Sequence, residues 1–275
     1  MLKKLLKYDL KSSVKFFTIG SVILAFIMLI CGFAISINDK LGNRAGELTA
    51  AESALSVLCG LVIFFSFAML FVYSIMIVVL VVRRFYCSFF TDEGYLTFTL
   101  PASTHSQLIS KTLFGTIYSF AGLVVQGISI LICGITVYIS SDIFSYIDES
   151  IFYSVLTEDV AQTVVTLSLG ALFVVCSEIF SVVVLYLAFT VGSALTSKYK
   201  LIAGIAVYFG INTVLQFVPF PLTIIFAETM PEEMISSMFG VLSMMLILGI
   251  VISLITSVIC YFITHHLLKT KLNLA

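Results

Sequence analysis

Six long apolar runs are the feature that most constrains the fold of this chain. Each is long enough to cross a bilayer, because a spanning helix needs about 20 mostly apolar residues. Backbone groups inside lipid must be satisfied within the chain, and the strict alternation of an outer-membrane barrel is absent from these runs. The sequence therefore predicts an all-α integral membrane protein, a single transmembrane domain over residues 1–275 with spans near 17–37, 55–82, 112–139, 164–195, 201–220 and 239–267.

Composition excludes the soluble classes of protein. Hydrophobic residues make up 60% of the chain and charged residues 11%. A soluble domain of that composition would expose apolar patches large enough to drive association. None of the six cysteines falls in a predicted outer segment, so no extracellular disulfide is expected.

Basic residues are distributed unevenly between the two sets of connecting segments. With the N-terminus inside, all of the 14 Lys and Arg residues except Lys40 and Arg44 fall in inner segments. This is the positive-inside pattern of multi-pass proteins. The sequence predicts location in the cell membrane with both termini cytoplasmic. The first apolar run is too long for a typical signal peptide, so we expect an uncleaved first span.

Residues 1–16 have the pattern of an amphipathic helix. Lys4, Lys7, Lys11 and Lys15 share one face of a helical wheel, and leucines share the other. Such a helix lies in the headgroup layer, with anionic membrane lipid as its partner. Asp9 falls toward the apolar face and breaks the pattern. A basic flank that only orients the first span is the alternative.

The segment 83–111, between the second and third spans, is predicted to be cytoplasmic. Thr104 to Gln107 match a capping box, which predicts that a helix begins there. Asp92 and Glu93 either mark the rim of a contact or cap a short helix. The preceding stretch carries apolar side chains that must be buried against the membrane surface or in a partner protein: Phe85, Tyr86, Phe89, Phe90, Tyr95, Leu96 and Phe98.

Two stretches, "KKLLKYDLKSS" at residues 3–13 and "RRFYCSFFTDEGYLTFTLPASTHSQLISK" at 83–111, carry a family resemblance. With the six spans, they resemble a permease subunit of the ABC-2 class of ATP-binding cassette transporters, in particular the small permeases of Firmicutes. The resemblance implies a type V exporter-like bundle. Its parts would be an interfacial connecting helix over 1–16, a coupling helix within the loop 83–111 and an outer re-entrant element over 220–238.

The resemblance also implies partners. A separate cytoplasmic ATPase would contact the 83–111 loop, with Tyr95 and Phe98 filling its groove, and a second permease, identical or different, would complete the path. The coupling residues it implies are Phe89, Phe90, Asp92, Glu93, Gly94, Tyr95 and Phe98. Cargo in this family is often a hydrophobic peptide, an antibiotic or a lipid-like compound, which implies export and resistance to antimicrobial peptides.

ATP and Mg would be held by the partner ATPase. This chain has no G-x-x-x-x-G-K-[ST] phosphate loop, so we expect no enzyme activity and no cofactor in it. The three histidines show no metal-ligand spacing, and nothing indicates nucleic-acid binding.

Glu178 is the only ionisable residue deep in a predicted span. A charge in lipid is costly and usually functional, so Glu178 is a candidate for the translocation path. A neutral glutamate hydrogen-bonded to Ser177 or Ser181 is the structural alternative. Three uncharged polar residues within spans either line the same path or bond between helices: Gln126, Asn212 and Gln216.

Two other functions are compatible with these patterns. An ion-coupled secondary transporter would use Glu178 as its ion-coupled group, although such proteins often have repeated halves and none is evident here. A non-transporting membrane scaffold or sensor component is the third possibility.

Overall fold

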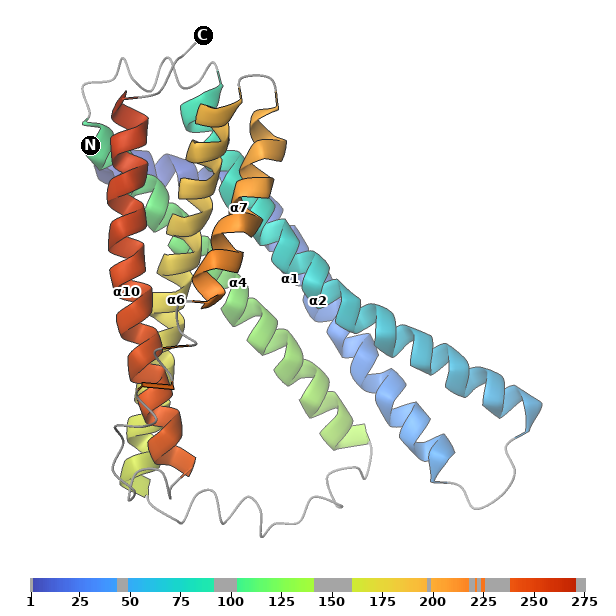
Figure 1. Ribbon diagram of the computed structural model, residues 1–275. Helices are drawn as coiled ribbons and strands as arrows, with labels where there is room; N and C mark the ends of the chain where they lie inside the picture. The colour runs from blue at the N-terminus through green and yellow to red at the C-terminus, as the bar shows by residue number, and fades with distance from the viewer. Residues whose placement is uncertain are drawn as a thin grey trace. The chain divides into compact units, whose positions relative to one another are not determined.

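The computed structural model describes residues 2–43, 49–91, 103–140, 160–196, 199–217, 221, 224–225 and 238–270. Within these residues, six helices are each long and apolar enough to cross a membrane. They are α1 (Leu2–Gly42), α2 (Ala50–Phe90), α4 (Thr104–Ser140), α6 (Val160–Leu195), α7 (Lys200–Phe217) and α10 (Met238–Thr270) (Figure 1). The predicted all-α class and the six potential spans are confirmed.

Helices α1 and α2 extend well beyond the predicted spans, and each contains 41 residues. Helix α1 is continuous from Leu2, so the predicted interfacial segment 1–16 and the first span belong to one helix. Helix α2 continues past residue 82 to Phe90, so the first part of the predicted 83–111 loop is helical. The predicted re-entrant element 220–238 lies almost entirely outside the described residues.

Helix α4 begins where the sequence predicts, but its cap is one residue earlier. The backbone N–H of Ser106 donates to Ser103 Oγ at 3.3 Å, and the N–H of Gln107 donates to the Ser103 carbonyl at 3.1 Å. Ser103 is therefore the N-cap residue, and Thr104 is the first residue of the helix. The capping box predicted from Thr104 to Gln107 is corrected accordingly.

Helix α2 has a reciprocal capping box that the sequence analysis missed. The backbone N–H of Thr49 donates to Glu52 Oε2 at 3.0 Å, and the N–H of Glu52 points to Thr49 Oγ1 at 3.4 Å. The T-x-x-E spacing at residues 49–52 is the signal that would have located this helix start.

The chain divides into two compact units, of which the second comprises residues 10–80 and 118–155. Here α1 and α2 lie side by side (Figure 1). A Cβ added at Gly20 on α1 would lie 2.6 Å from Met76 Cε on α2, so glycine permits the close approach. The core of this unit consists of Leu24, Met28, Cys31, Tyr73, Ile77 and Cys133.

The first unit comprises residues 1–9, 81–117 and 156–275. Helix α6 is its central element and packs between α7 and α10 (Figure 1). Every residue from 182 to 190 is buried, as expected for a helix surrounded by other helices. Gly192 on α6 and Gly204 on α7 bring the two backbones together, because a Cβ on Gly192 would overlap the backbone of Gly204.

Candidate functional site

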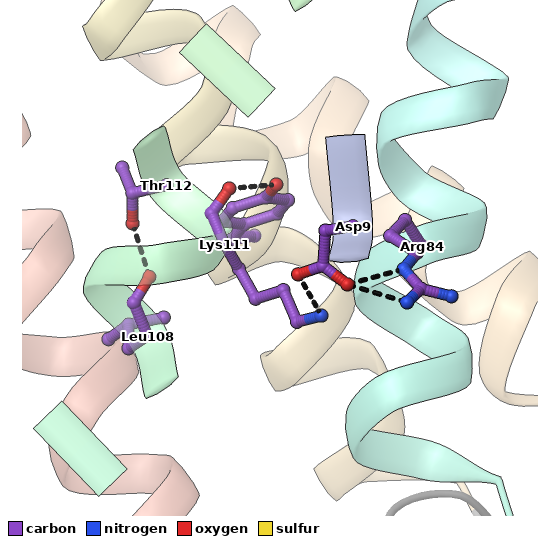
Figure 2. Close-up of polar contacts among 6 residues, drawn as sticks. Asp9, Arg84, Leu108, Lys111 and Thr112 are labelled. Atoms are coloured by element: carbon purple, nitrogen blue, oxygen red, sulfur yellow. Dashed lines mark hydrogen bonds and ion pairs between the residues drawn. The ribbon is translucent and has the colours of Figure 1, made fainter. Parts of the chain in front are cut away.

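A buried cluster of three charged residues joins α1, α2 and α4 within the first unit. The carboxylate of Asp9 on α1 lies between the two cations (Figure 2). Its Oδ1 accepts a hydrogen bond from Arg84 Nε at 2.7 Å and is 2.6 Å from Arg84 Nη2. Its Oδ2 accepts from Lys111 Nζ at 2.6 Å. One acid thus holds the end of α2 and the beginning of α4 together.

Burial makes this cluster sensitive to the loss of a charge. Asp9 is 3% exposed and Lys111 is 7% exposed, whereas 26% of the Arg84 side chain remains exposed. Among the described residues, two cations face this one carboxylate. Removing one partner of a buried ion pair typically costs about 3–5 kcal/mol, because the other charge is left uncompensated. The three helix segments are therefore held in one arrangement.

The cluster explains why the amphipathic pattern of α1 is imperfect. The sequence places Asp9 toward the apolar face, and in the structure that position is buried, while Lys7 and Lys11 on the opposite face are exposed. The sequence analysis treated Lys111 and Arg84 only as markers of the inner side and did not predict their pairing. The one signal available was an acid on the buried face of the segment 1–16, whose other charged residues are lysines.

Tyr186 extends the cluster to α6. Its buried hydroxyl donates to the backbone carbonyl of Lys111 at 2.9 Å, and its ring stacks on Phe85 of α2 with centroids 4.1 Å apart and planes 10° apart. Gly115 of α4 leaves room for this ring, since an added Cβ would lie 2.7 Å from Tyr186 Oη. Four helices of the first unit therefore meet around the cluster.

Of the seven predicted ATPase-coupling residues, two lie within the described part of the chain. Phe89 has no exposed surface, and its ring lies 5.1 Å from that of Phe85. The chain itself therefore covers Phe89, which corrects the expectation that its ring is presented to a partner. Phe90 is partly buried beside Tyr86. The other five lie outside the described residues: Asp92, Glu93, Gly94, Tyr95 and Phe98.

The uncharged candidates for a translocation path belong to both units, with Gln126 in the second and Asn212 and Gln216 in the first. Gln126 on α4 donates from Nε2 to the Leu70 carbonyl at 3.0 Å and to Ser74 Oγ at 2.7 Å, both on α2. These are two interhelical hydrogen bonds within the second unit. Asn212 donates to the Tyr208 carbonyl of its own helix at 3.0 Å, and Gln216 is exposed.

Glu178 is half-buried on α6. The hydroxyl of Ser177 donates to the Val174 carbonyl at 2.9 Å, and that of Ser181 donates to the backbone carbonyl of Glu178 at 3.0 Å. Neither serine binds the carboxyl group, which corrects the structural alternative considered for this residue. Among the described residues, the carboxyl group of Glu178 has no hydrogen-bond or ion-pair partner.

The helices define the class of the protein, which is an all-α multi-pass membrane protein. Comparison of the chain with protein-family models, with curated proteins and with solved structures gave no match. Its function is therefore inferred from the residues and contacts described above.

Proposed function

We propose that this chain is the membrane-spanning permease subunit of an ATP-driven exporter, with ATP and Mg bound by a separate cytoplasmic ATPase. The observation that supports the proposal best is the Asp9–Arg84–Lys111 cluster. Arg84 and Lys111 flank the connection between α2 and α4, and both bind the same buried carboxylate. A partner that displaces this connection therefore acts on the ends of three helices at once.

The packing around the cluster also favours the transmission of movement from the α2–α4 connection to the other helices of the first unit. Phe85 and Phe89 are fully buried at the end of α2, and Tyr186 links α6 both to Phe85 and to the backbone of Lys111. Packed side chains and hydrogen bonds of this kind carry energetic coupling between distant sites. In the proposed cycle, closure of the ATPase pushes the α2–α4 connection, and the attached helices rock together.

The same proposal assigns the residues that contact the ATPase, the second permease, the orientation of the termini and the class of cargo. Phe90, Asp92, Glu93, Gly94, Tyr95 and Phe98 supply the contact with the ATPase, whereas Phe89 supports that contact from within the chain. A second permease, identical or different, completes the path in the cell membrane, and both termini are cytoplasmic. The cargo class is a hydrophobic peptide, an antibiotic or a lipid-like compound, as the resemblance to ABC-2 permeases implies.

The test is copurification with a candidate ATPase. We expect the Tyr95→Ala/Phe98→Ala variant to insert normally but to lose association with the ATPase and stimulation of its activity. The matched control is Phe71→Ala/Tyr138→Ala, which removes one Phe and one Tyr from exposed positions on α2 and α4. Wild-type association and stimulation in the Tyr95→Ala/Phe98→Ala variant would remove the coupling role of the loop.

A second candidate function is ion-coupled secondary transport through Glu178. It is favoured by the half-buried carboxyl group that has no partner among the described residues, because ionisable groups in spans commonly mark ion pathways. The discriminating variant is Glu178→Gln, assayed in vesicles that contain no ATPase. Substrate uptake driven by an ion gradient and abolished in Glu178→Gln would support this function. Absence of uptake without ATP would reject it.

A further inference from the structure

Two of the three histidines of the chain come together between α4 and α10 in the first unit. His105, next to the start of α4, has its ring centroid 5.6 Å from that of His265 near the end of α10, and the two planes are 63° apart. The ring centroid of Tyr261, which lies one turn before His265, is 5.7 Å from the ring centroid of His105. His105 is exposed and His265 is half-buried, so solvent ions reach the pair.

The separation of the two rings matches that of imidazoles sharing a metal ion. A zinc–nitrogen bond is about 2.0–2.1 Å, so the ion lies roughly 3.2 Å from each ring centroid, and a tetrahedral angle places the centroids about 5.2 Å apart. The observed 5.6 Å differs from this value by a few tenths of an ångström. The separation of the two rings is therefore compatible with their binding one ion.

Tyr261 is placed to orient one of the two ligands. Its hydroxyl oxygen lies 3.5 Å from His105 Nδ1. A metal-binding histidine generally donates its second ring N–H to an oxygen, which fixes the tautomer and leaves the other nitrogen for the ion. With Nδ1–H directed to Tyr261, the lone pair of His105 Nε2 is available for coordination.

We propose that His105 and His265 form a two-imidazole site for a divalent transition-metal ion, with Tyr261 as a positioning residue. Imidazole ligands suit zinc, nickel and copper ions, whereas calcium and magnesium prefer oxygen. The described residues contain no group of three His, Cys, Asp or Glu side chains that could hold a metal. Water therefore completes the coordination. A bound ion ties the beginning of α4 to the end of α10, independently of any transport activity.

The experiment uses the full chain, purified in detergent without a polyhistidine tag and titrated with copper(II) alone. Electron paramagnetic resonance counts the nitrogen ligands directly. We expect two imidazole nitrogens in the wild type, and one in both His105→Gln and His265→Gln. Copper should bind either variant at least about tenfold more weakly, since loss of a ligand costs no less than loss of an outer-shell partner.

His266→Gln is the matched control, because His266 is adjacent to His265 but exposed. Its spectrum and affinity should match those of the wild type. Tyr261→Phe should retain two nitrogens while binding roughly 10–100-fold more weakly. A wild-type spectrum with fewer than two imidazole nitrogens, or unchanged affinity in both His105→Gln and His265→Gln, would overturn the proposal and leave the contact as aromatic packing. Circular dichroism of the metal-free variants verifies that each one is folded.

Discussion

The hydroxyl of Tyr186 on α6 donates a 2.9 Å hydrogen bond to the backbone carbonyl of Lys111 on α4, the residue whose ammonium group binds Asp9. The side chain of Lys111 thus contacts α1, and its main chain contacts α6. A single residue near the start of α4 connects the charge cluster to the most buried helix of the first unit.

Tyr186→Phe removes this hydrogen bond but keeps the ring stacked on Phe85. We expect the free energy of unfolding to fall by about 1 kcal/mol, the usual net contribution of one hydrogen bond. Tyr186→Ala also loses the ring and should cost about 3–5 kcal/mol. Chemical unfolding in detergent measures both values. Tyr8→Phe, at an exposed position, is the control and should have no effect.

Asp9→Asn removes the only carboxylate of the cluster and leaves Arg84 and Lys111 facing each other. The expected cost is about 3–5 kcal/mol of unfolding free energy, because the buried Lys111 and the partly exposed Arg84 both lose this counter-charge. Asp39→Asn makes the same change on the same helix, where Asp39 only accepts an exposed 3.0 Å hydrogen bond from Asn43. Equal losses in the two variants would mean that the cluster contributes nothing to stability.

Gly115→Ala tests the close packing of α4 against Tyr186. The added methyl group would lie 2.6 Å from Val182 Cγ1 and 2.7 Å from Tyr186 Oη, and overpacking of this kind costs roughly 1–3 kcal/mol. Gly134 on the same helix has no neighbour within 4 Å of an added Cβ. Gly134→Ala should therefore raise stability slightly, because alanine favours the helix. Thermal unfolding of the two variants should shift in opposite directions.

Ser103→Ala should lower stability by about 1 kcal/mol, because it removes the side chain that caps α4. Thr104→Ala, one residue later, removes no cap and should be close to neutral. Hydrogen exchange at the first amides of α4 measures the local effect. Faster exchange in Thr104→Ala than in Ser103→Ala would contradict the assigned position of the cap.

Gln126→Leu distinguishes packing from a role in the translocation path. Loss of the bonds to Leu70 and Ser74 should cost about 0.6 kcal/mol and at most about 1.7 kcal/mol, the range measured for polar contacts between membrane helices. Transport per folded molecule should be unchanged. Altered cargo selectivity with unchanged stability would instead support a role for Gln126 in the translocation path. Gln216→Leu, at an exposed position, serves as the control for stability.

The number and class of the helices could be predicted from the sequence, but their ends could not. An apolar run indicates which residues of a helix face lipid. It does not indicate where the helix ends, because a hydrogen-bonded helix also continues through polar residues. Helix α1 therefore includes Asp9 and its neighbouring lysines, and α2 continues through Arg83 and Arg84 to Phe90.

The contacts of the candidate site could not be predicted, because they join residues far apart in the sequence. Asp9 and Lys111 are separated by 102 positions, and His105 and Tyr261 by 156. Local spacing has no information about such pairs. The exceptional place of Asp9 on the helical wheel was visible, but its partners depend on how α2 and α4 pack.

The near-contact of Gly192 and Gly204 limits how the first unit moves. With no side chain between the two backbones, neither a lipid tail nor a water molecule has room to wedge α6 from α7 at that level. We therefore expect α6 and α7 to stay together at that level in any movement of the first unit.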